Sequence, residues 1–360
     1  MIDKPKEPMH HRRTHNIIAL ILGLSVPSIA QGTLPKTYIC YKTQERITID
    51  GTLNELSWQK APWTDFFLDI EGMKKSPPRF RTRAKMLWDD SCFYVGAELQ
   101  ETDVWGTIVE RDAVIFHDND FEVFIDPNGD NHEYYEFEIN ARNTVWDLFL
   151  PKPYKDGGHA VDAWNCEGLK SAVKVYGTIN HPGDVDTGWS VEIAMPWKAL
   201  ARYAHKACPP GEDDQWRVNF SRVEWKTRMI GGQYQKIPNV REDNWVWSPQ
   251  GLIDMHWPEH WGYVQFTSSQ FGQAKFKPDS SLRARMVLMN IYYAERKYFA
   301  VHNQWAGGVD ELKADISPEQ LDGTIVTISL TADGYVASAE CLNSGRTKTL
   351  LHIRQDSLIW

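Results

Sequence analysis

The chain has 360 residues, of which 42% are hydrophobic and 24% charged, and this composition excludes a wholly disordered, collagen-like or coiled-coil protein. Its length suggests two domains, or one large sandwich with an appendage. Lys plus Arg number 39 and Asp plus Glu 48, a net charge of −9 that argues against nucleic acid as a partner.

Residues 1–30 have the pattern of a secretory signal peptide. Arg12 and Arg13 precede an apolar run, and small residues end at Ala30. The apolar run falls short of the roughly 20 residues that a membrane span needs, and no later segment could form one. We therefore expect cleavage before Gln31 and export to the periplasm or the extracellular space. The mature chain would keep all five cysteines, whose spacing matches no zinc pattern and does not reveal their pairing.

From Arg83 to Phe266 the hydrophobic pattern has a period of two residues, which is typical of strands with one buried face. Turn residues separate the alternating segments, and the only helix expected in this region is a short one at 198–205. The pattern predicts an all-β sandwich or barrel. The segments predicted as strands are 93–99, 121–125, 135–139, 145–150, 172–176, 189–195 and 216–220.

The hydrophobic pattern changes after about Thr267. Apolar residues from Leu282 to Tyr293 recur at spacings of four, three and four, which predicts a helix over 280–301. Three short strands are predicted after it, at 325–330, 335–341 and 349–353. We therefore expect a small α+β domain over 278–360 to follow a β-sandwich domain over 31–267.

An acidic loop follows the predicted strand 121–125. The segment Asp126-Pro-Asn-Gly-Asp-Asn131 places side-chain oxygens at alternate positions, as many calcium sites do. Asp126, Asn128 and Asp130 are therefore candidate ligands for a structural calcium ion. The alternative is an ordinary solvated turn.

Glu136 and Glu138 lie two residues apart on a predicted strand, so both side chains share one face of the sheet. Paired carboxylates can hydrolyse glycosides, although a same-face pair on one strand is more often a solvated surface. The sequence contains no nucleophile elbow, phosphate loop or dinucleotide fingerprint. We predict no catalytic residue.

Fourteen of the 16 tryptophans lie between Trp58 and Trp261. Flat aromatic rings stack against the apolar faces of sugars, and tryptophan also fills sandwich cores. We expect most of these residues to be buried. The loop stretches 244–247 and 255–261 carry the candidates for ligand binding.

Several motifs, in their order along the chain, resemble family 9 carbohydrate-binding modules. The resemblance spans about residues 45–266 and implies a jelly-roll-like β-sandwich that binds a glycan or oligosaccharide, holds structural calcium and has no catalytic role of its own. The residues that carry it are Ile49-Asp-Gly51 with Glu55 and Trp58, Leu87-Trp-Asp-Asp90, Asn119-Asp-Phe-Glu-Val-Phe-Ile-Asp126 and Trp189-Ser-Val-Glu-Ile-Ala-Met-Pro-Trp197.

Position by position, the resemblance implies that Glu101 and Glu122 contact sugar and that Phe116 and Trp257 supply aromatic rings. Phe116 stands where xylanase-borne members have tryptophan, and Glu138 stands where they have arginine. A carboxylate in place of a cation inverts the local charge, so specificity for sugar reducing ends does not follow from the resemblance.

The leading prediction is an exported, non-catalytic carbohydrate-binding protein that serves polysaccharide catabolism. A glycoside hydrolase acting through Glu122, Glu136 or Glu138 is the first alternative. The second is a haem-binding electron-transfer sandwich with Met255 and His256 as candidate ligands, although adjacent residues rarely bind one iron.

Overall fold

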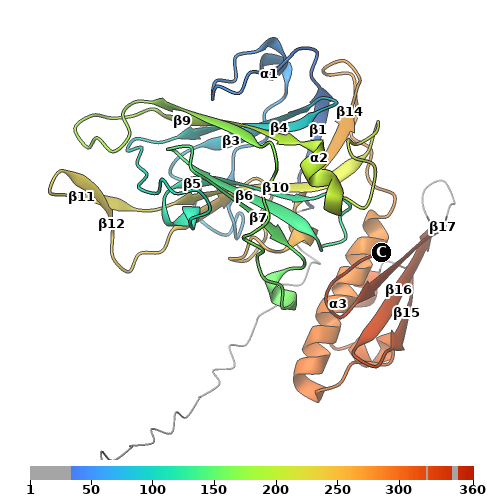
Figure 1. The fold of residues 1–360 in the computed structure, drawn as a ribbon. Coiled ribbons are helices and arrows are strands. Elements are labelled where there is room, and N and C mark those ends of the chain that lie inside the picture. Colours follow the sequence, from blue (N-terminus) through green and yellow to red (C-terminus); the bar gives the residue numbers. More distant parts are fainter. Residues whose placement is uncertain (1–33, 322, 343–347) are drawn as a thin grey trace, which may run out of the picture.

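The computed structural model describes residues 34–321, 323–342 and 348–360 (Figure 1). The predicted signal segment 1–30 lies outside these residues, so its cleavage stays a prediction. No helix within the described ranges combines the length and the apolar character that crossing a membrane requires.

Most of the chain forms one large sheet that curls into two packed layers (Figure 1). Its twelve strands are β1 (Thr37–Lys42), β2 (Leu68–Asp69), β3 (Thr82–Trp88), β4 (Cys92–Gln100), β5 (Asp120–Asp126), β6 (Tyr134–Asn140), β7 (Val145–Leu150), β8 (Lys170–Tyr176), β9 (Gly188–Pro196), β10 (Gln215–Glu224), β13 (Asp243–Val246) and β14 (Gly262–Thr267). They run in the order β7-β6-β5-β10-β14-β1-β3-β4-β9-β8, with β13 beside β10 and β2 beside β13. The parallel pairs β1–β14 and β1–β3 join the two layers.

The remaining elements lie at the edges of the sandwich or after it. They are the helices α1 (Leu56–Lys60), α2 (Trp197–Leu200), α3 (Leu282–His302) and α4 (Pro318–Leu321), the hairpin β11 (Thr227–Ile230) with β12 (Gln233–Lys236), and the three-stranded sheet β15 (Ile325–Leu330), β16 (Tyr335–Leu342) and β17 (Lys348–Arg354). The predicted fold class is confirmed: a β-sandwich followed by a small α+β unit. The helix predicted over 280–301 is α3.

The core between the two layers consists of the residues that the alternation placed on the buried face. Phe121, Val123 and Ile125 of β5 are fully buried, as are Phe93 and Val95 of β4. Because side chains alternate across a strand, the intervening residues of β5 lie on the opposite face of the sheet.

Three separate parts of the chain meet at one buried carboxylate. Glu192 of β9 accepts hydrogen bonds from the backbone N–H groups of Asp50 (3.0 Å) and Gly51 (3.2 Å) and from the indole N–H of Trp58 (2.8 Å). Gly51 has a φ of +84°, and a Cβ atom there would lie 2.8 Å from the backbone nitrogen of Lys174. The motif around Ile49-Asp-Gly51 therefore anchors the amino-terminal segment to the edge of the sandwich.

Substituting Gly51 by alanine should destabilise the protein by about 2–4 kcal/mol, because strain at positive φ adds to the backbone clash. Gly157→Ala is the matched control, since Gly157 has a similar φ of +78° but a Cβ atom there would meet nothing within 4 Å. That control should cost about 1 kcal/mol. Urea denaturation measures both, and equal losses would show that the close approach to Lys174 is without effect.

The carboxy-terminal unit packs against the sandwich through α3, which lies between its own three-stranded sheet and the turn joining β5 to β6 (Figure 1). The Arg285 guanidinium donates to the carbonyl of Gly129 in that turn, and the Asn131 amide donates to the carbonyl of Ser357 at 3.0 Å. The predicted division at 267–278 stays a prediction.

Candidate functional site

The outer face of β5 carries polar residues in register with its neighbours. Glu122 pairs with Ser221 of β10 on one side and with Glu138 of β6 on the other. Glu138 in turn pairs with Trp146 of β7. Four adjacent strands therefore contribute one continuous row of side chains across the sheet.

This row forms the floor of a cleft of about 380 Å³. The walls come from segments that are distant in sequence, including the stretch after β7 and the loops on either side of β13. The residues that line the cleft are Ile70, Phe116, Glu122, Phe124, Glu136, Glu138, Trp146, Leu148, Tyr154, Val223, Arg241, Glu242, Asn244, Ile253, Asp254, Met255 and His256.

Phe116, Trp146 and Tyr154 are among the aromatic side chains that line this cleft. The rings of Phe116 and Trp146 are close to parallel, with centroids 6.5 Å apart and an interplanar angle of 29°. Phe116 is 38% exposed, and Tyr154, whose ring contacts His256, is 44% exposed. Exposed rings beside polar groups are suited to packing against the apolar face of a pyranose.

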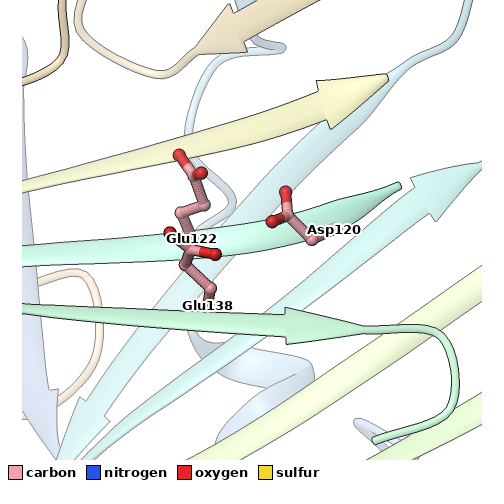
Figure 2. A group of neighbouring side chains, drawn as sticks. All are labelled: Asp120, Glu122 and Glu138. Carbon is pink, nitrogen blue, oxygen red and sulfur yellow. The ribbon is translucent and has the colours of Figure 1, made fainter. Parts of the chain in front are cut away.

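Asp120, Glu122 and Glu138 form a compact carboxylate cluster (Figure 2), and two of its members, Glu122 and Glu138, line the cleft. One oxygen from each lies within 4.8 Å of the others, and the three residues are 0%, 6% and 2% exposed. Burial raises the pKa of Glu122 to about 7. Burial and neighbouring carboxylates also raise the pKa values of Asp120 and Glu138 well above the ordinary range.

Glu136 extends the acidic floor toward His256. Its side chain is buried, and its Oε2 lies 4.0 Å from His256 Nε2, while Nδ1 of that histidine is 2.9 Å from the Tyr134 hydroxyl. Burial lowers the pKa of His256 to about 3, so the imidazole is neutral. The expectation that Glu136 and Glu138 form a solvated surface is wrong, because both strands that flank β6 and the loops above it cover these residues.

The structure brings together two of the four residues that the resemblance implied. Glu122 and Phe116 line the cleft, whereas Glu101 and Trp257 do not. Glu101 is buried and forms an ion pair with Arg222 at 2.8 Å. The Trp257 ring stacks on Tyr293 of α3, with centroids 5.3 Å apart, and the Lys155 ammonium lies 4.4 Å from its centre.

The tryptophans of the stretch 244–247 were expected to be available for binding, and the structure contradicts this. Trp245 and Trp247 are 3% and 1% exposed and belong to the core. Trp146, Tyr154 and Asp254 line the cleft instead. None of these three residues was predicted as a site residue, although Trp146 lies on the outward phase of the predicted strand 145–150.

The oxygens of the predicted calcium ligands already accept hydrogen bonds within their own loop. Asp126 accepts from the backbone N–H groups of Gly129 (2.8 Å) and Asn131 (3.0 Å). Asp130 accepts from the amide of Asn128 (2.7 Å) and the backbone N–H of His132 (2.8 Å). These contacts close the turn, and calcium at this loop stays a prediction.

Comparison with known proteins identifies the class to which the sandwich is related. Residues 49–209 match the family model described as Carbohydrate family 9 binding domain-like. The Exoglucanase XynX of Acetivibrio thermocellus is 30% identical over 120 residues, which are 32% of this chain and 9% of that enzyme. The resemblance to family 9 carbohydrate-binding modules is thereby confirmed for this part of the chain.

Solved structures of the same class are similar to this chain. A family 9 carbohydrate binding module from Caldicellulosiruptor kristjanssonii in complex with cellotriose covers 68% of this chain and 100% of its own, at 14% identity and a TM-score of 0.42. Its complex with glucose covers 67% of this chain and 100% of its own, at 14% identity and a TM-score of 0.43.

Proposed function

We propose that the protein binds a glycan or an oligosaccharide in the cleft over β5, β6 and β7 and does not cleave it. One observation carries this proposal: polar atoms beside the aromatic rings are buried and lack a hydrogen-bond partner in the protein. They are Glu136 Oε2 and the indole nitrogen of Trp146, both from residues that line the cleft. A sugar has hydroxyl groups that both donate and accept, so it can satisfy both atoms.

The residues of the cleft divide into two roles. Phe116, Trp146 and Tyr154 provide apolar faces for the sugar ring. Glu122 and Glu136 provide carboxyl oxygens that accept hydrogen bonds from hydroxyl groups. The match to the carbohydrate-binding family model over 49–209 supports the same ligand class.

Trp146→Ala should weaken glycan binding roughly 5- to 150-fold, because it removes about 1–3 kcal/mol of apolar contact. Isothermal titration against the strongest hit of a glycan array measures the change, with circular dichroism to check folding. Trp63→Ala is the control, since Trp63 packs against Arg83 and Lys85 and does not line the cleft. Unchanged affinity in a folded Trp146→Ala protein would show that the glycan binds elsewhere. Trp257→Ala, measured in the same series, tests the aromatic position that the resemblance implies.

Export and a role in polysaccharide catabolism are also part of the proposal. They rest on the signal-like segment 1–30 and on the family to which residues 49–209 are similar. Protein secreted by its natural host should begin at Gln31. An intact amino terminus on the secreted protein would contradict the cleavage.

Glycoside hydrolysis is kept as a second candidate because Glu122, Glu136 and Glu138 all line the cleft. A buried carboxyl with a raised pKa is the form that a general acid requires. We expect no release of reducing sugar from the glycans that bind. Release that disappears in Glu136→Gln would establish the enzyme instead.

A further inference from the structure

The carboxylates of Asp120, Glu122 and Glu138 form no ion pair with any lysine or arginine in the described ranges. Arg222, the next residue along β10 from Ser221, points to the other face of the strand and pairs with Glu101 and Glu224. Carboxylates that are removed from water and crowded together are costly unless a cation joins them.

Backbone N–H groups hold the carboxylates of Asp120 and Glu138 in place by hydrogen bonds to one oxygen of each. The Val223 N–H donates to Asp120 Oδ1 at 3.2 Å, which leaves the buried Oδ2 without a partner. The Phe116 N–H donates to Glu138 Oε2 at 2.9 Å. Such supporting hydrogen bonds fix ligand orientation in metal sites.

We propose that Asp120, Glu122 and Glu138 bind a divalent cation, of which calcium fits best, beside the part of the cleft that Glu122 and Glu138 line. Oxygens that share one calcium ion at about 2.3–2.6 Å lie up to about 5 Å apart, which accommodates the 4.8 Å cluster. Water entering from the open side of the cleft completes the coordination. This site is separate from the predicted loop of Asp126, Asn128 and Asp130, and it does not depend on the proposed sugar ligand.

The test is calorimetric titration of the EDTA-stripped full-length protein with CaCl₂ alone. The wild-type protein should bind one calcium ion at this cluster. Glu138→Gln should weaken calcium binding by at least roughly tenfold, because even the loss of a residue that only hydrogen-bonds to a metal ligand lowers metal affinity by that factor. Asp120→Asn should have the same effect. Asp130→Asn, in the β5–β6 turn, is the matched control and should leave this binding event unchanged.

A second measurement separates an ion ligand from a merely structural carboxylate. In EDTA, Glu138→Gln should melt at about the same temperature as the wild type. Calcium should then raise the melting temperature of the wild type and not that of the variant. Absence of binding at millimolar CaCl₂ would overturn the proposal. Calcium binding that is lost only in Asp130→Asn would also overturn the proposal. A stripped protein that binds glucosamine oligomers and no calcium would overturn it too, because the cluster would then bind an ammonium group.

Discussion

Glu259→Gln should lower the free energy of unfolding by about 3–5 kcal/mol, because it leaves the ammonium group of Lys155 buried without a carboxylate partner. The side chains of Lys155 and Glu259 are only 8% and 5% exposed. The Tyr293 hydroxyl donates to the same carboxylate oxygen. This pair therefore lies where the segment after β7, the turn before β14 and helix α3 meet.

The surroundings of Lys155 explain why it cannot easily turn to solvent. Its ammonium lies 4.4 Å from the centre of the Trp257 ring and 5.4 Å from that of Tyr293. Burial by itself would raise the pKa of Glu259, but Lys155 and the hydrogen bonds around the carboxylate hold this pKa below its ordinary value. Glutamine keeps the shape of the side chain and removes the charge, so the loss measures the ion pair.

Urea denaturation of the full-length chain measures this loss. Asp310→Asn is the control, since Asp310 and Lys313 form an ion pair whose side chains are 88% and 72% exposed, and it should change stability by less than about 1 kcal/mol. Limited proteolysis should at the same time cut Glu259→Gln faster within 267–281, because the docked α3 helix is loosened. A Glu259→Gln protein as stable as the control would show that the docking does not rely on this pair.

The alternation of hydrophobic residues was sufficient to predict the core of the sandwich. Phe121, Val123 and Ile125 are buried because period two assigns them to one face, and the same rule holds on β4 and β9. The helical spacing from Leu282 to Tyr293 likewise predicted α3. These patterns are local, and each can be read within one element.

The cleft could not be predicted in the same way, because its burial arises from long-range pairing. Glu136 and Glu138 look like a solvated face when β6 is considered alone. In the folded chain, β5 and β7 flank them and residues 241–256 cover them. Sequence patterns reveal which residues share a face, but not which distant loop closes over that face.

Trp257 and Trp146 show in the same way that sequence context does not reveal which ring faces a ligand. Trp257 follows a histidine and precedes a proline in a loop, a context that predicts exposure, yet α3 from outside the family resemblance covers its ring. Trp146 lies within a strand, a context that predicts burial, yet its phase turns it into the cleft. Packing between distant elements therefore decides which tryptophan ring faces the cleft.

Raising the pH from 6.5 to 8.5 in the absence of divalent cations should destabilise the protein by roughly 2 kcal/mol through Glu122, Glu192 and Glu295, with allowance for solvent screening. Burial raises the pKa of each of these three carboxyls to about 7. A carboxyl with a raised pKa holds its proton more tightly in the folded state than in the unfolded state. Its favourable contribution is therefore lost as the pH rises through the folded pKa.

The pH window matters because buried histidines act in the opposite direction. Burial lowers the pKa of His256 to about 3 and that of His260 to about 4, so these residues favour the folded state increasingly as the pH rises through 6.5, and this gain levels off above about pH 7.5. Burial also lowers the pKa of Lys85 to about 8, and above pH 6.5 the carboxyls outweigh these groups. Differential scanning calorimetry in EDTA should show a melting temperature roughly 4–8 °C lower at pH 8.5 than at pH 6.5. Glu295→Gln should make this difference smaller, because one of the carboxyls that titrate in this window is removed. A melting temperature that rises across the window would mean that these carboxyls are ionised well below pH 6.5 in the folded protein.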